Sequence, residues 1–127
     1  MKIQSGFSLI ELLIVIALLG ILTAIAVPQY NAYRIRSNRA EGKVALVQAA
    51  QALERLYTRE SSYANGKVGT TFPAKSEHQL YELSFSDGPN ATGYTLRATG
   101  LGPQAGDAGC TPLTLTSTGA KGPAGCW

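Results

Sequence analysis

The chain has 127 residues, of which 45% are hydrophobic, and a net charge of +3 from 11 basic and 8 acidic side chains. This length allows one domain core and leaves no room for two. A charge of +3 is too small to imply nucleic acid binding by itself. The apolar residues are concentrated in the first 27 positions, and the rest of the chain is richer in Gly, Thr, Ser and Pro.

The first predicted element is an apolar helix, with residues 7–29 assigned to a membrane or assembly segment. The 21 residues from Phe7 to Val27 would extend about 31 Å as an α-helix, close to the ~30 Å hydrocarbon thickness of a bilayer. Their apolar character is interrupted only at Ser8, Glu11, Gly20 and Thr23. A carboxylate deep in lipid costs about 2.5–3.5 kcal/mol, so an acid at position 11 indicates a function.

Two general interpretations explain this segment only in part. A secretory signal peptide would use Lys2 as its basic end and Ala24-Ile25-Ala26 as its cleavage site. However, the apolar run is longer than such peptides need and contains an acid. A plain membrane anchor explains the length but does not explain Glu11.

The stretch Gly6-Phe7-Ser8-Leu9-Ile10-Glu11, preceded by a short leader with one lysine, resembles the processing motif of type IV prepilins. The resemblance implies that a leader of residues 1–6 is removed after Gly6 and that the new terminal residue, Phe7, is N-methylated. Pro28 also falls where this family usually has a proline. The resemblance is strong over residues 1–60 and only architectural beyond them.

The processing motif gives Glu11 a partner. Cleavage after Gly6 frees an α-amine on Phe7, and methylation keeps its positive charge. In a packed filament this ammonium can pair with Glu11 of a neighbouring subunit, and a close pair recovers much of the desolvation cost that a lone charge does not. We therefore predict that Glu11 and Phe7 form an assembly charge pair.

The basic residues that flank the apolar segment favour the membrane orientation opposite to the one that the processing motif implies. Only Lys2 and the α-amine precede the segment, whereas four basic residues follow it: Arg34, Arg36, Arg39 and Lys43. The positive-inside rule alone would place the C-terminal domain in the cytoplasm. The processing motif and the two cysteines favour a domain outside the cytoplasm, and we expect that orientation.

Pro28 is the expected helix break. It cannot donate a hydrogen bond to the Ala24 carbonyl, and Gly20 and Gly42 weaken the helix further. Two interpretations stay open from the sequence: a simple kink in a long helix, or a segment that loses helicity when subunits pack.

The globular domain is expected over residues 30–127, beginning with a helix at 30–60. One apolar stripe is predicted from residues at spacings of three and four, namely Leu46, Ala50, Leu53 and Tyr57, widened by Ala49 and Leu56. This stripe should form the surface against which a sheet packs.

A connecting loop at residues 61–78, with Asn65-Gly66 and Pro73 as turn residues, should precede a sheet at 79–118. Alternating apolar and polar residues predict three strands, at Gln79–Ser86, Gly93–Thr99 and Pro112–Thr118. The expected fold class is α+β: a long N-terminal helix packed on a small antiparallel sheet, as in type IV pilins.

The two cysteines lie in the last eighteen residues, in a Gly/Pro/Thr-rich stretch. An even pair beside a membrane segment suggests one disulfide formed in an oxidising compartment, and the alternative is two reduced thiols. We expect a Cys110–Cys126 disulfide, with the loop 110–126 along one edge of the sheet. In the chain-entropy model such a loop contributes about 3 kcal/mol.

No catalytic constellation is evident, and we expect neither enzymatic activity nor a cofactor or metal. His78 is the only histidine and is expected on the surface. Asp87 and Asn90 flank a Gly-Pro turn but supply too few ligands for calcium.

The resemblance implies a structural subunit of a type IV pilus, more a minor than a major pilin, that primes or joins assembly and supports motility, adhesion or DNA uptake. Its implied partners are other pilin subunits in a homo- or hetero-filament, a prepilin peptidase and methylase, and an inner-membrane assembly platform. The implied location is the bacterial inner membrane with a periplasmic C-terminal domain, then the extracellular pilus.

Two alternatives are kept: a pseudopilin of a type II secretion system, and a pilus-tip receptor for DNA uptake. Pseudopilins as a family carry a calcium loop that is not evident here. DNA, the less favoured partner, would be contacted through basic side chains, with Tyr63, Tyr94 or Trp127 available for stacking; the basic candidates are Lys67, Lys75, Arg97 and Lys121.

Overall fold

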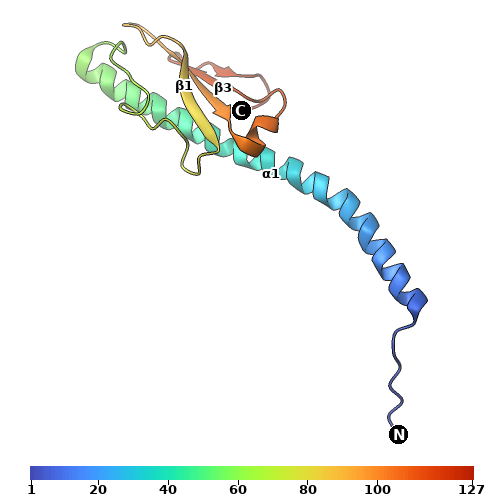
Figure 1. The fold of residues 1–127 in the computed structure, drawn as a ribbon. Helices are drawn as coiled ribbons and strands as arrows, with labels where there is room; N and C mark the ends of the chain where they lie inside the picture. The colour runs from blue at the N-terminus through green and yellow to red at the C-terminus, as the bar shows by residue number, and fades with distance from the viewer. The chain divides into compact units, whose positions relative to one another are not determined.

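A computed structural model describes all residues from 1 to 127 and divides them into two units, Met1–Arg34 and Ile35–Trp127. One helix, α1 (Leu9–Glu60, 52 residues), contributes to both units (Figure 1). Its N-terminal half supplies the first unit from Leu9 onwards. Its C-terminal half carries the sheet of the second unit, and each unit is described by itself.

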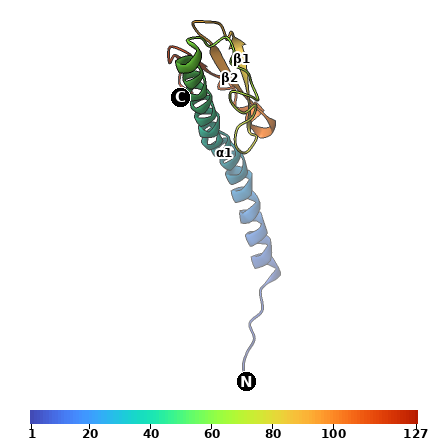
Figure 2. The same ribbon diagram turned by 90° about the vertical axis from the view of Figure 1, so that its left-hand side faces the viewer.

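The second unit contains a four-stranded antiparallel meander in the order β1-β2-β3-β4. The strands are β1 (Tyr81–Asp87), β2 (Thr95–Gly100), β3 (Leu113–Thr116) and β4 (Lys121–Gly122). A short 3-10 helix, η1 (Gly102–Gly106), lies between β2 and β3. The sheet covers one side of the C-terminal half of α1, as two perpendicular views agree (Figures 1 and 2).

The expected α+β architecture and the three predicted strands are confirmed, each within a few residues. β4 was not predicted, because its two residues lie in a Gly/Pro-rich stretch with no alternating pattern. The alternating pattern predicted the other three strands because their apolar residues lie opposite one another in register. Leu83 of β1 pairs with Ala98 of β2, which pairs with Leu113 of β3. All three side chains are buried and face α1.

The stripe of α1 that enters the core differs from the expected one. The buried residues follow alternating spacings of four and three: Gly42, Leu46, Ala49, Leu53 and Leu56. Ala50 is only partly buried, and Tyr57 is 40% exposed, so the prediction was wrong for these two positions. Tyr57 instead stacks on Tyr63, with ring centroids 4.6 Å apart, because the loop after α1 folds back along the helix.

Cys110 and Cys126 form the expected disulfide, with their Cα atoms 5.5 Å apart. The enclosed loop supplies β4 at the edge of the sheet, as expected. Cys126 is buried with the core cluster, so the bridge fastens the C-terminal segment to the main core.

Gly42 has a packing role that the sequence did not reveal. A Cβ built on it would lie 3.0 Å from three carbon atoms of the Tyr81 ring, and this tyrosine is fully buried. The glycine therefore lets β1 approach α1 closely, and it is more than a weak point in the helix.

We expect Gly42→Leu to lower the free energy of unfolding by about 1–3 kcal/mol, because the ring has no free space to move into. The exposed Gln48 on the same helix provides a matched control, since Gln48→Leu should change the free energy by less than about 0.5 kcal/mol. Urea unfolding of the full chain in detergent micelles, followed by circular dichroism, measures both. Equal effects of the two variants would show that the close approach at Gly42 is unimportant.

Candidate functional site

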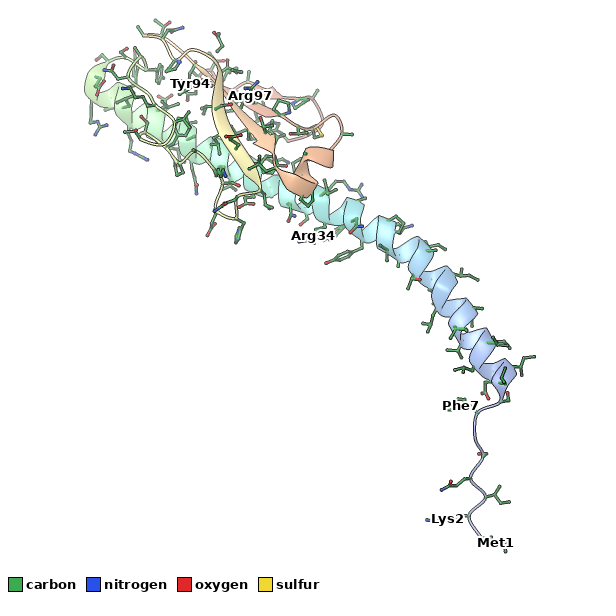
Figure 3. The ribbon with its side chains drawn as sticks, viewed as in Figure 1. Met1, Lys2, Phe7, Arg34, Tyr94 and Arg97 are labelled. Atoms are coloured by element: carbon green, nitrogen blue, oxygen red, sulfur yellow. A yellow bond between two sulfur atoms is a disulfide. The ribbon has the colours of Figure 1, made fainter.

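The N-terminal motif lies at the start of α1, in a part of the chain where every side chain is exposed. Residues Met1–Phe7 precede the helix, and Phe7 is 87% exposed just before its first turn (Figure 3). A Cβ built on Gly6 meets nothing within 4 Å. The fold therefore imposes no demand for glycine at this position, and any such demand must come from a molecule that acts on the chain.

Ser8 caps the first turn of α1, which the sequence analysis missed. The backbone N–H of Glu11 donates to the Ser8 hydroxyl oxygen at 3.2 Å, and the Leu12 N–H donates to the Ser8 carbonyl at 3.2 Å. The Ser-x-x-Glu spacing is the signal that could have revealed it, since it is the signature of a capping box. The cap fixes the helix start at Leu9 and leaves Phe7 outside the helix.

Glu11 lies in the first turn, where the positive end of the helix dipole favours a negative charge. Its carboxylate has no partner within the chain, because the two salt bridges of the structure join Arg39 to Asp107 and His78 to Glu41. The Glu11 carboxylate is thus free to pair with a charged group outside the chain.

The helix that follows is long and apolar enough to cross a membrane by length and composition, and none of its most apolar window is buried. It continues without interruption through Pro28 in the isolated chain. Thr23 donates its hydroxyl to the carbonyls of Leu19 at 2.9 Å and Gly20 at 3.0 Å. Pro28 therefore does not end α1 in the isolated chain, and both interpretations of this position, a kink in a long helix and loss of helicity on packing, stay predictions.

A second constellation holds η1 against α1 in the globular unit. The Arg39 guanidinium donates from Nε to Asp107 Oδ2 at 2.7 Å and from Nη2 to Oδ1 at 2.6 Å. Hydrogen bonding to Asp107 raises the pKa of Arg39. The buried Gln104 donates from Nε2 to the Ile35 carbonyl at 3.1 Å and to the Tyr81 hydroxyl at 2.9 Å. This polar network joins η1 and Asp107 to α1 and β1.

The four basic DNA candidates lie on different elements. Arg97 projects from the outer face of β2 and donates to Ser84 Oγ at 3.3 Å (Figure 3). The backbone of Lys75 forms an isolated antiparallel β-bridge with Glu82 of β1. Glu82 is two residues from Ser84, so both lie on the same face of the strand. Register therefore places Lys75 and Arg97 on one face of the sheet, with an acidic residue beside them.

The other two basic candidates do not join this face. Lys121 pairs in register with the inward-facing Leu115, and its amine lies 5.0 Å from the centroid of the Trp127 ring. Lys67 is an exposed residue of the loop after α1. The expectation that Tyr63 and Tyr94 could stack on bases was wrong, because both rings are buried in an aromatic cluster. Burial is the main reason why the pKa of each of these tyrosines rises to about 12.

The remaining candidates behave as surface and turn residues. The His78 side chain is 75% exposed, and its Nδ1 lies 3.1 Å from Glu41 Oε1. Asn90 Oδ1 accepts from the backbone N–H groups of Thr92 and Gly93, both at 2.9 Å, so it closes a turn. No group of three or more His, Cys, Asp or Glu side chains is placed to hold a metal ion.

Comparison with known proteins gives two family models that together cover most of the chain. Residues 1–27 match the prokaryotic N-terminal methylation motif. Residues 28–114 match the model described as type IV minor pilin ComP, DNA uptake sequence receptor.

Among curated proteins, a fimbrial protein of Pseudomonas aeruginosa is 38% identical over 89 residues, covering 68% of this chain and 52% of that protein. The type IV major fimbrial protein FimA of Dichelobacter nodosus (strain VCS1703A) is 36% identical over 101 residues, covering 74% of this chain and 60% of FimA. The chain thus spans about half the length of the curated relatives it matches, or slightly more.

Among solved structures, a type IV pilin from Shewanella oneidensis has a TM-score of 0.53 at 28% identity, covering 73% of this chain and 97% of that one. The Neisseria meningitidis non-core minor pilin PilV has a TM-score of 0.59, covering 72% of this chain and 87% of that one. Its identity to this chain is 19%, so it shows the shared fold alone.

Proposed function

Because the chain belongs to the type IV minor pilins, we propose that it is a pilus subunit held in the inner membrane by α1 until it joins a filament. Its leader is removed after Gly6, Phe7 is N-methylated, and the mature subunit then docks in register with its neighbours. Membership of this family points to a structural protein, and the processing chemistry is done to the chain by other enzymes.

The observation that carries the proposal is the unpaired Glu11 carboxylate at the start of an exposed apolar helix. Such a charge costs about 2.5–3.5 kcal/mol at the centre of a bilayer and less near an interface, so it limits how deep Glu11 can lie. The ammonium of Phe7 on a neighbouring subunit, placed outside the helix by the Ser8 cap, would supply the missing partner. Pairing therefore stabilises a subunit that docks with its neighbour in register.

The orientation we propose places the globular unit in the periplasm. The Cys110–Cys126 disulfide supports it, since disulfides persist in oxidising compartments. One of the basic residues that argued against it, Arg39, is neutralised by Asp107 and thus adds little to a positive-inside signal. In this orientation a prepilin peptidase would reach Gly6 from the cytoplasmic side, and an inner-membrane platform would then extract the mature chain.

Mass spectrometry of the native protein should show a chain that begins at Phe7 and carries one added methyl group. Gly6→Val should block cleavage without disturbing the fold, because Gly6 contacts nothing in the chain and a β-branched residue would meet the peptidase. Ile3→Val, within the leader, is the control and should be processed normally. A mature chain that begins at Val27 or Pro28 would instead establish an ordinary signal peptide.

A second candidate function, DNA binding at the pilus surface, is favoured by one observation: the family model that covers residues 28–114 is described as a DNA uptake sequence receptor. Lys75 and Arg97 on the outer face of the sheet are the candidate contacts, with Lys67 and Lys121 as separate ones. Glu82 beside Lys75 and Arg97 reduces the positive potential of that face. We therefore rank the structural role first.

Duplex DNA titrated into the full chain at several salt concentrations tests this second function. If the face binds phosphates, Arg97→Gln should weaken binding and lower the slope of log affinity against log salt by about 1. Arg59→Gln, at the end of α1, is the matched control and should leave the slope unchanged. An affinity insensitive to both salt and Arg97→Gln would remove DNA binding from this face.

A further inference from the structure

Three side chains near the end of the apolar half of α1 share one helix face and are exposed. Tyr30 is 64% exposed, Tyr33 is 65% exposed, and Arg34 is also exposed. Spacings of three and four residues place them on the same side of the helix. All three belong to the unit Met1–Arg34, and Figure 3 labels Arg34 on the helix.

Nothing within the chain explains why these three side chains occur together. The two salt bridges of the structure involve other residues, and no side-chain hydrogen bond satisfies either phenol or the Arg34 guanidinium. Two exposed tyrosines and an unpaired arginine on one face suit a partner outside the chain that offers both apolar contact and negative charge.

The position of this face along the helix matches the headgroup region of a bilayer. No charged residue lies between Glu11 and Arg34, and Tyr30 follows Glu11 by 19 residues, which is about 28 Å at 1.5 Å per residue. This length is close to the ~30 Å hydrocarbon thickness of a bilayer. When Glu11 lies at one interface, Tyr30 and Tyr33 therefore reach the headgroup region of the opposite one.

The chemistry of the three residues fits that region. Phenol rings place an apolar body in the acyl boundary and a hydroxyl in water, which is why tyrosine is enriched at membrane interfaces. A guanidinium forms forked hydrogen bonds with phosphate and is attracted by anionic lipids.

We propose that Tyr30, Tyr33 and Arg34 form an interfacial anchor that binds anionic lipid headgroups and fixes the depth of the chain in the membrane before assembly. The anchor rests on the proposed membrane-held state and adds to it a lipid contact and a depth setting. By holding the far end of the span, it keeps Glu11 at the other interface, where the processed Phe7 ammonium of a neighbour can reach it.

Depth is measured by spin-labelling a cysteine introduced at Asn31 in the full chain, whose own two cysteines are tied in a disulfide. The chain is reconstituted in vesicles of phosphatidylcholine and phosphatidylglycerol, three parts to one. Accessibility to oxygen and to a water-soluble nickel chelate then reports the depth of the label. We expect the wild-type label at the phosphate level, and Tyr30→Ser/Tyr33→Ser to shift it by about one helical turn, ~5 Å.

A conservative pair and an arginine pair test the chemistry. Tyr30→Trp/Tyr33→Trp should keep the wild-type depth, because tryptophan has the same interfacial preference. The lipid that remains around the chain in polymer-bounded discs should be enriched in phosphatidylglycerol at least twofold over the bulk. Arg34→Gln should bring that enrichment close to onefold, whereas Arg59→Gln should leave it unchanged.

The outcomes separate this inference from the proposed function. A wild-type chain that does not insert at all would contradict the membrane-held state itself. Insertion with an unchanged depth in the serine double variant, or an enrichment that Arg34→Gln does not lower, would overturn the anchor and leave the pilus role intact.

Discussion

Replacing Glu11 with valine should leave the chain in the membrane and exclude it from the pilus. Loss of the carboxylate removes its insertion cost, which is at most about 2.5–3.5 kcal/mol for a charge at the bilayer centre, so insertion should be unchanged or improved. The globular unit should fold as before, because its core begins with Leu46 of α1. In the proposed pairing, the Phe7 ammonium then loses its partner and meets the filament core as an uncompensated charge.

The measurement is the amount of this subunit in sheared filaments relative to the amount in membranes, by immunoblot. Glu11→Asp, which is one methylene shorter, should be partly tolerated, and Glu11→Lys should not be. Ser8→Ala is an informative companion: it removes the cap that fixes the helix start but keeps the carboxylate, so its defect should be the milder one. Normal incorporation of Glu11→Val in a subunit shown to lie within the shaft would refute the pairing mechanism.

The parts of this molecule that could be predicted from the sequence are those with local causes. Gly6, Phe7 and Glu11 form a motif within six residues, with Gly6 and Phe7 in the segment before α1 and Glu11 in its first turn. The strands were predicted because Leu83 and Leu96 each lie in a run that alternates between apolar and polar residues, and both side chains are buried. These patterns need no knowledge of the tertiary structure.

The parts that escaped prediction depend on residues far apart in the chain. Gln104 and Asp107 are polar residues in a stretch rich in Gly and Ala, and nothing nearby marks them as buried. Their partners on α1, Ile35 and Arg39, are 69 and 68 positions away, respectively. Gly42 looked like a weak point in the helix because its neighbour, Tyr81, is a residue of the sheet.

The prediction of the buried stripe on α1 was wrong at Ala50 and Tyr57 because it, too, depends on residues far away in the chain. Spacings of three and four describe two adjacent stripes on this helix, and only the position of the sheet decides which one is covered. The covered stripe includes Gly42, which a hydrophobicity pattern does not count.

Asp107→Ala should lower the free energy of unfolding of the globular unit by about 3–5 kcal/mol, as expected when one partner of a buried ion pair is removed. Asp107 is 5% exposed and Arg39 15% exposed, and two short hydrogen bonds join them. Loss of the carboxylate leaves the Arg39 guanidinium unpaired and with little access to water. The Gln104 hydrogen bond to the Ile35 carbonyl is then the side-chain hydrogen bond that still joins η1 to α1. The Asp107 backbone carbonyl, which accepts from the Cys110 N–H at 3.0 Å, is kept in the alanine variant, so the expected loss comes from the side chain alone.

The double variant Arg39→Met/Asp107→Leu should recover most of this loss, because apolar side chains of similar volume need no partner. Urea unfolding of the full chain in detergent micelles gives the two single effects and the coupling energy of the cycle. His78→Ala, which breaks the exposed contact with Glu41, is the matched control and should cost less than about 1 kcal/mol. If Asp107→Ala costs no more than His78→Ala, the ion pair does not hold η1 to the helix, and the Gln104 hydrogen bonds to Ile35 and Tyr81 are the polar contacts that do so.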